Sequence, residues 1–202
     1  MSKHTILIAN RGEIAVRIQR AVAELGWRSL LIYAEDDQHS LAVYQADVAV
    51  PLQGVGVSAY LDHEQILRIA REQGCVAIHP GYGFLSENAE FARRAREAGL
   101  IFVGPDPEVL ALFGDKARAR ALALECGVPI LPGIDHSVTL AEAKGFFAAL
   151  PAGAAMVIKA IAGGGGRGMR VVTHADEIDT AYARCQSEAQ AAFGDGAVYV
   201  EQ

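Results

Sequence analysis

The sequence predicts an α/β protein that begins with a doubly wound, mostly parallel sheet and continues in a second region of different organisation. In the first 113 residues, short β-like runs alternate with helical patterns, as expected for parallel strands joined by crossover helices. The first helical pattern is amphipathic, so it should pack on a sheet. Farther along the chain the order of the elements changes, which indicates a second domain.

The expected strands of the first region are short apolar runs bounded by turn or helix signals: Ile6 to Ala9, Leu30 to Tyr33, Val48 to Val50, Val76 to Ile78 and Ile101 to Val103. Apolar residues at helical spacing predict a helix after the first run, and Gly26 should end it. Asp62 and Ser86 are expected to cap two further helices, and Gly99 to end the second. The result is an open sheet with helices on both faces.

The second region starts after a Pro/Gly-rich passage and two short helical patterns separated by Gly114 and Asp115. We therefore predict domains of residues 1–114 and 115–202. Thr139 opens a helix through a capping box, and Thr173 with Asp176 is expected to open another that ends near residue 193. The last β-like run, residues 198–200, lacks a following turn or cap, so we expect a chain truncated within its second domain.

Composition narrows the function classes. The chain is 51% hydrophobic and 21% charged, but no apolar stretch approaches the roughly 20 residues that span a bilayer. No signal peptide is recognisable at the start, so we expect a cytosolic protein. The net charge of −6 argues against a nucleic-acid partner. Cys75, Cys126 and Cys185 lack metal-ligand spacing and are expected to be buried thiols.

The most informative segment runs from Lys159 to Arg170 and holds five glycines within residues 163–168. Backbone N–H groups of such a loop can approach phosphate oxygens closely because no Cβ blocks them. The loop lies between two β-like runs, so it predicts the tip of a hairpin, with Lys159 on the preceding strand as a point charge. The alternative is a flexible hairpin tip that binds no ligand.

Two common phosphate motifs are excluded by the residues around the glycines. A dinucleotide fingerprint opens a helix, whereas residues 169–172 read as a strand. A Walker A lysine comes after the last glycine, whereas Lys159 precedes the first. Lys116, at the start of a helical pattern, could reach the same phosphates, although taken alone it reads as a surface lysine.

A second candidate site is the loop from His79 to Asn88, which comes directly after a predicted parallel strand. Open α/β sheets bind ligands at the carboxyl ends of their strands. Pro80, Gly81 and Gly83 predict a tight turn there. We favour a structural, pocket-shaping role for His79 over catalysis.

Four segments together resemble motifs of the biotin carboxylases in their order, their spacing and their amino-acid sequences: Ile8 to Arg17, His79 to Asn88, Gly114 to Lys116 and Lys159 to Arg170. The resemblance covers essentially the whole chain. It implies a biotin carboxylase N-terminal, or pre-ATP-grasp, domain and then the first, incomplete part of an ATP-grasp domain. In this family ATP phosphorylates bicarbonate to carboxyphosphate, and the resulting CO₂ is captured by biotin on a carrier protein.

The resemblance also implies roles for individual residues. Lys116 and Lys159 would contact ATP phosphates, Met169 would line the adenine pocket, and Glu201 would begin the hinge segment that touches adenine. Gly163, Gly164, Gly165 and Gly166 would form the lid. Mg²⁺ or Mn²⁺ would accompany ATP, but the metal ligands and catalytic residues are expected beyond residue 202, so the fragment alone should be inactive.

The implied partners are bicarbonate, a biotin carboxyl carrier protein or domain, and a carboxyltransferase subunit or domain. A homodimer is expected for the full-length protein, with Arg17 and Arg20 as contact candidates or as solvated residues paired with Glu13 and Glu24. We lean toward an acyl-CoA carboxylase of fatty acid metabolism. The alternatives are a non-catalytic nucleotide-binding or assembly module and another bicarbonate-using ATP-grasp ligase, such as a carbamoyl phosphate synthetase.

Overall fold

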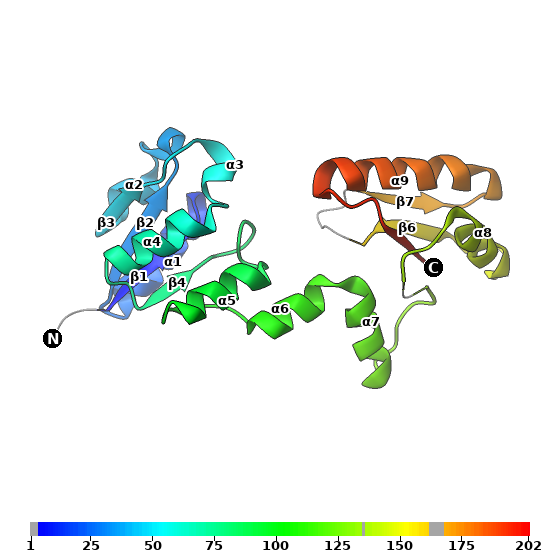
Figure 1. Ribbon diagram of the computed structural model, residues 1–202, viewed down its shortest axis with the longest axis horizontal. Coiled ribbons are helices and arrows are strands. Elements are labelled where there is room, and N and C mark those ends of the chain that lie inside the picture. The colour runs from blue at the N-terminus through cyan, green and yellow to red at the C-terminus, as the bar shows by residue number, and fades with distance from the viewer. Residues whose placement is uncertain (1–3, 135, 162–167) are drawn as a thin grey trace. The chain divides into compact units, whose positions relative to one another are not determined.

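A computed structural model describes residues 4–134, 136–161 and 168–202 of the chain (Figure 1). The chain divides into two compact units, Met1–Ala111 and Leu112–Gln202. In each unit one sheet carries the core. The expected domain limits of 1–114 and 115–202 remain a prediction. None of the described helices is long and apolar enough to cross a membrane.

The first unit contains a five-stranded sheet in the order β3-β2-β1-β4-β5, and every neighbouring pair is parallel. Its strands are β1 (Thr5–Ile8), β2 (Arg28–Tyr33), β3 (Val48–Pro51), β4 (Ala77–His79) and β5 (Ile101–Phe102). Its helices are α1 (Gly12–Glu24), η1 (Glu35–Asp37), α2 (Leu41–Gln45), α3 (Gly56–Ala59), α4 (His63–Glu72) and α5 (Ala89–Glu97). The α/β fold class and the five predicted strands are therefore confirmed, whereas the sequence patterns do not predict η1, α2 and α3.

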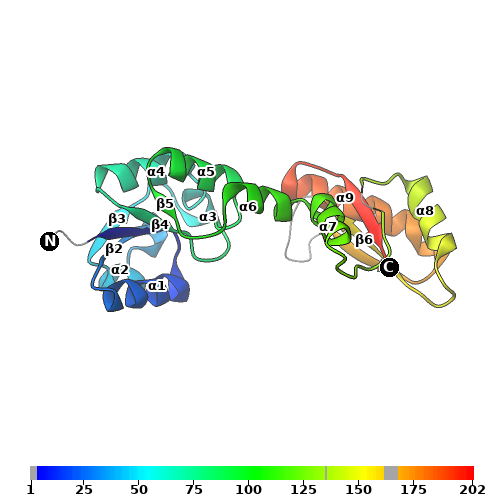
Figure 2. The same ribbon diagram turned by 90° about the horizontal axis from the view of Figure 1, so that it is seen from below.

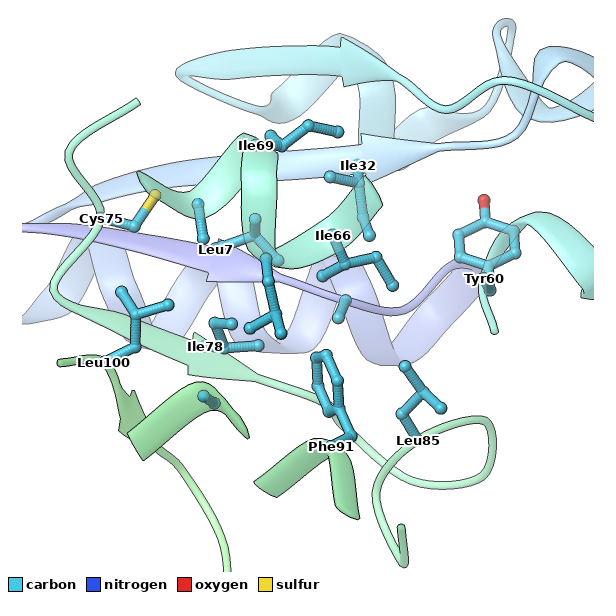
Figure 3. Close-up of a cluster of buried hydrophobic side chains, with 14 of the residues drawn as sticks. Leu7, Ile32, Tyr60, Ile66, Ile69, Cys75, Ile78, Leu85, Phe91 and Leu100 are labelled. Carbon is cyan, nitrogen blue, oxygen red and sulfur yellow. The ribbon is translucent and has the colours of Figure 1, made fainter. Parts of the chain in front are cut away.

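Helices cover both faces of this sheet (Figure 2). On one face, Leu7, Ile32 and Ile78 pack against residues of α4 and α5, and Figure 3 shows Ile66 and Phe91 reaching into this cluster. On the other face a second cluster joins β-strand residues to α1 and α2. Alternating side chains of each buried strand thus supply two cores, which is the doubly wound arrangement. Fully burying one such side chain contributes about 1.5–3 kcal/mol.

The second unit is built on a three-stranded antiparallel sheet in the order β7-β6-β8. Its elements are α6 (Pro107–Gly114), which begins in the first unit, α7 (Lys116–Glu125), α8 (Leu140–Ala149), β6 (Met156–Ala160), β7 (Met169–Val172), η2 (Ala175–Glu177), α9 (Ile178–Phe193) and β8 (Val198–Glu201). Residues of α8 and α9 share a core with one face of the sheet, including Ile158 and Val200. The predicted hairpin strands on either side of the glycine segment are confirmed.

The outer edge of β8 is not left open. The backbone N–H of Ile134 donates to Val200 O at 3.0 Å, and the N–H of Val138 donates to Val198 O at 2.9 Å. The N–H of Gln202 in turn donates to Pro132 O at 2.8 Å. Because of this pairing all four residues of β8 are buried, Glu201 among them.

Three local expectations need correction. Asn88, not Ser86, caps α5, because its Oδ1 accepts from Phe91 N at 2.8 Å. The turn η2 before α9 opens with a capping box of His174 and Glu177 rather than of Thr173 and Asp176, and the Glu177 carboxylate accepts from the N–H groups of Thr173 and His174. Cys126 is exposed, while the other two cysteines are buried as expected. The predicted caps at Asp62 and Thr139 are confirmed.

Candidate functional site

The face of the second sheet that points away from the α8–α9 core carries most of the residues singled out in the sequence. Lys159 pairs with Met169 on β7 and with Tyr199 on β8. Val157, two residues earlier, pairs with Glu201. Directly opposed residues of antiparallel strands project to the same side, and so do residues two apart along a strand. Lys159, Met169 and Glu201 therefore share one face.

The Glu201 carboxylate lies between two cations. Its Oε1 forms an ion pair with Nζ of Lys159, and its Oε2 is 3.5 Å from Nη1 of Arg120 on α7. The side chains of Glu201, Arg120 and Lys159 are only 12%, 14% and 27% exposed. A carboxylate this far from water needs compensating charge, and both neighbours supply it.

Lys116, the first residue of α7, reaches the end of β6. Its Nζ donates to Ala160 O at 3.3 Å and to Ile161 O at 3.0 Å. Burial, and after it the positive charge of Lys159, lower the pKa of Lys116 below its usual value. Lys116 therefore belongs to the same electrostatic cluster as Lys159. The interpretation of it as an ordinary surface lysine does not hold.

This cluster fits a polyphosphate. Among the contacts of the described residues, three cationic side chains, Lys116, Lys159 and Arg120, surround the carboxylate of Glu201 or the end of β6 beside it. Two lysines close enough for one to lower the pKa of the other are stabilised when an anion binds between or beside them. Lysine ammonium groups suit this task because they act as point charges that adjust to phosphate oxygens.

The hairpin that should carry the lid is described only at its base. Gly163, Gly164, Gly165 and Gly166 lie outside the described residues. Gly168 has φ +67°, and a Cβ there would lie 3.0 Å from Cβ of Ala160, so any larger residue would be both strained and crowded. Met169 comes next, with 42% of its surface exposed, on the face that carries Lys159.

The second candidate, the loop after β4, is held in place by Asn10. This residue is 2% exposed, and its Nδ2 donates to Pro80 O at 2.6 Å and to Tyr82 O at 2.8 Å. Nδ1 of His79 accepts from Gly81 N at 3.1 Å, and burial lowers the pKa of His79. A neutral, hydrogen-bonded His79 supports the structural role expected for it. Asn10 lies where the chain connections of β1 and β4 diverge, the usual ligand crevice of such sheets.

Arg120 is the site residue that sequence reasoning missed. It lies four residues after Lys116, and therefore on the same side of α7. That spacing was the available signal, but a lone arginine in a helix with little amphipathic character resembles a solvated residue. Its role depends on Glu201, which lies far away in the sequence on β8.

A parallel doubly wound domain followed by a lysine-bearing hairpin sheet is the arrangement expected for the first part of an ATP-grasp ligase. Comparison with family models specifies which kind. The model described as biotin carboxylase, N-terminal domain, matches residues 2–110. The model described as carbamoyl-phosphate synthase L chain, ATP binding domain, matches residues 115–202. The chain belongs to the biotin carboxylase family.

Among curated proteins, the chain is similar to pyruvate carboxylases. It is 48% identical over 202 residues to the enzyme of Schizosaccharomyces pombe and 50% identical over 200 residues to that of Bacillus subtilis. Each match covers 98% of this chain and 17% of the relative. The chain thus spans about a sixth of the length of these relatives, and the activities of their remaining parts are not carried by these residues.

Two solved structures show the same fold. One is the biotin carboxylase domain dimer of the 2-oxoglutarate carboxylase from Hydrogenobacter thermophilus, in complex with MgADP, ADP and bicarbonate. It is 42% identical with a TM-score of 0.93, over 100% of this chain and 44% of that one. The other is the biotin carboxylase–β-γ-ATP complex from Campylobacter jejuni, 38% identical with a TM-score of 0.94, over 98% of this chain and 44% of that one.

These relatives bear on the expected acceptor. The sequence interpretation favours an acyl-CoA carboxylase of fatty acid metabolism, but the similar curated enzymes are pyruvate carboxylases. The expected cytosolic location stays a prediction, since the similar mouse and human enzymes are named as mitochondrial.

Proposed function

We propose that this chain supplies the phosphate-binding part of a biotin carboxylase that uses ATP and bicarbonate to carboxylate biotin. The observation that carries the proposal is the cluster of Lys116 and Lys159 around the end of β6, with Glu201 and Arg120 beside it. Phosphoryl transfer requires cations that are already in place around the phosphates, since its catalysis rests on positioning and charge stabilisation.

Within this proposal each site residue has a role. Lys116 and Lys159 contact the phosphates of ATP, and Gly163, Gly164, Gly165 and Gly166 form the lid above them. Met169, exposed beside Lys159, contacts the adenine, and Glu201 starts the hinge segment along it. Mg²⁺ or Mn²⁺ bound with ATP would neutralise phosphate charge. We assign no metal ligand and no catalytic residue to positions 1–202, and we expect the chain alone to be inactive.

We further propose that the parent enzyme carboxylates a 2-oxo acid, pyruvate being the first candidate. Support comes from the two sets of relatives, which are carboxylases of pyruvate and of 2-oxoglutarate. The parent would then require a biotin carboxyl carrier domain and a carboxyltransferase domain. Biotin would act as the carboxyl acceptor of the first half-reaction.

A homodimer is proposed for the full-length protein through the α1–α2 side of the first unit. Leu41 and Tyr44 are 59% and 72% exposed there, and a cavity of about 520 Å³ opens between Leu41, Arg17 and Arg20. Arg17 and Arg20 are both exposed, and among the described ion pairs none joins either of them to Glu13 or Glu24. Leu41→Glu should shift the full-length protein toward monomer in sedimentation velocity.

The activity test uses the longest natural chain that contains these residues, with the 202-residue chain beside it. Bicarbonate-dependent ATP hydrolysis is measured with and without free biotin. Biotin-stimulated turnover in the long chain alone is the expected result. Lys159→Met should abolish that turnover, whereas Lys144→Met, which removes a surface lysine paired with Asp179, should leave it unchanged.

The acceptor is tested in the same preparation by incorporation of labelled bicarbonate into pyruvate, 2-oxoglutarate, acetyl-CoA or propionyl-CoA. Label in pyruvate or 2-oxoglutarate supports the proposal, and label in an acyl-CoA refutes it. ATP binding without biotin-stimulated turnover in the long chain would favour the non-catalytic module. Bicarbonate-dependent turnover that ignores biotin would favour a different ATP-grasp ligase.

A further inference from the structure

Glu201 is already paired with Lys159, one of the cations that an anion entering the site would need. Its carboxylate holds Nζ of Lys159 in an ion pair, and the side chain of Glu201 is 12% exposed. A phosphate that recruits Lys159 therefore competes with Glu201 for the same ammonium group. If Lys159 turns away, a buried carboxylate loses its nearest counter-ion, and leaving such a charge unpaired is strongly unfavourable.

Arg120 is the other cation within reach of that carboxylate. Its Nη1 is 3.5 Å from Oε2 of Glu201, whereas a full charge-assisted hydrogen bond measures about 2.7–2.9 Å. Its Nε is buried without a hydrogen-bond partner among the described atoms. The guanidinium thus has unused donor capacity and stands slightly too far from Glu201 to use it. A small approach would complete the pair.

The surroundings keep Arg120 in that position. Its Nη2 donates to Leu131 O at 2.8 Å, so the guanidinium is tied to the segment that covers β8. A Cβ on Gly133 would lie 2.9 Å from Nη2 of Arg120 and 3.0 Å from Cβ of Glu201. Glycine at position 133 therefore leaves the space in which the two side chains meet.

We propose that Arg120 is a positioning residue for ATP, which holds the charge of Glu201 so that Lys159 can leave the carboxylate and engage a phosphate. The inference rests on the proposed function and adds a residue to it. In the absence of nucleotide, Lys159 and Arg120 share Glu201. When the triphosphate binds, Arg120 takes the carboxylate alone, and the release of Lys159 no longer strands a buried charge.

The test measures the Kd of MgATP by calorimetry and the KM for ATP in the full-length enzyme. Arg120→Met should weaken ATP binding about tenfold, because Glu201 then retains Lys159. Arg120→Lys keeps the charge and should stay within about threefold of the unsubstituted enzyme. Arg118→Met, an exposed arginine of the same helix, is the matched control and should change neither constant.

A double substitution separates this role from simple support of the fold. Glu201→Gln removes the charge that Arg120 is proposed to hold, so Arg120→Met should have little further effect in that background. Equal losses from Arg120→Met in both backgrounds would overturn the inference, as would normal ATP binding by Arg120→Met alone. If Arg120→Met does not fold, Arg120→Gln, which keeps donors for the Leu131 carbonyl, provides the same comparison.

The unsubstituted enzyme separates the two proposals. If it binds no MgATP, the proposed function fails and the inference fails with it. If it binds MgATP but the Arg120 variants show no charge-dependent loss, only the inference fails.

Discussion

A β-carbon on Gly81 would lie 2.7 Å from Nδ2 of Asn10. Asn10 comes after β1 and Gly81 after β4, so the contact joins the two strand ends that border the crevice of the first sheet. Gly81 also has φ +67°, a left-handed conformation that side chains disfavour. Both the space and the backbone at this position call for glycine.

Gly81→Ala should therefore destabilise the chain more than Gly83→Ala. Gly83 has nearly the same φ, +66°, but nothing lies within 4 Å of its missing Cβ. We expect about 1 kcal/mol of lost unfolding free energy at Gly83 from backbone strain alone, and about 2–3 kcal/mol at Gly81, where Asn10 must also shift. Urea unfolding followed by circular dichroism measures both values. Equal losses would mean that the Asn10 contact adds nothing.

The cap of α5 provides a second prediction. Oδ1 of Asn88 accepts from Phe91 N at 2.8 Å, and the asparagine φ and ψ are those of an extended N-cap residue. Asn88→Ala should cost about 1 kcal/mol of unfolding free energy, in the range typical of lost caps. Ser86→Ala is the matched control and should stay within about 0.5 kcal/mol. A larger loss of unfolding free energy in Ser86→Ala than in Asn88→Ala would mean that Ser86 is the cap.

The same helix illustrates where sequence reasoning failed. Ser86 and Asn88 are both capping residue types, two positions apart, and the apolar pattern begins at Phe91 in either case. The choice is made by the preceding turn, in which Ser86 N donates to Gly83 O and Leu85 is buried. That turn depends on left-handed residues and on a tertiary contact, neither of which local periodicity reveals.

The order of strands and helices was predictable because its signals lie within short stretches of sequence. Five short apolar β runs, amphipathic helices between them and glycine stops were enough to predict the doubly wound sheet. The hairpin around the glycine segment could be inferred from two short β runs. The pairing of Arg120 with Glu201 was not predictable, because it depends on Pro132, Ile134 and Val138 covering β8 and so burying the carboxylate.

Thiol reactivity should distinguish the three cysteines. Burial raises the pKa of both Cys75 and Cys185 to about 11, so few of their thiolates exist near pH 8, and both side chains are shielded from reagent. Cys126 is exposed. Ellman's reagent at about pH 8 should therefore label one thiol quickly in the native chain and all three in denaturant.

Cys126→Ser should remove the fast reaction and leave the slow labelling unchanged. Fast labelling that persists in this variant would show that Cys75 or Cys185 is accessible in solution. Cys126→Ser should also leave unfolding free energy within about 0.5 kcal/mol, as expected for an exposed site.

The charge cluster in the second unit makes a prediction about pH. Burial, and then the charge of Lys159, lower the pKa of Lys116 below its usual 10.5. The unfolded chain therefore holds the Lys116 proton more tightly than the folded chain does. As pH rises from the lowered pKa toward 10.5, this group should make the unfolding free energy increase.

Lys159→Met should raise the pKa of Lys116 toward its usual value by removing the neighbouring charge, while the part of the shift that burial causes remains. A titration of the Lys116 ε-carbon by NMR measures this directly. Lys144→Met, which removes a lysine paired with Asp179 on the surface, should not change the pKa of Lys116.

Binding of a polyphosphate should raise the pKa of Lys116 in the unsubstituted protein, because a nearby anion favours the ammonium form. An unchanged Lys116 titration in Lys159→Met would mean that the two ammonium groups are not electrostatic neighbours, and the phosphate-binding cluster would lose its main support.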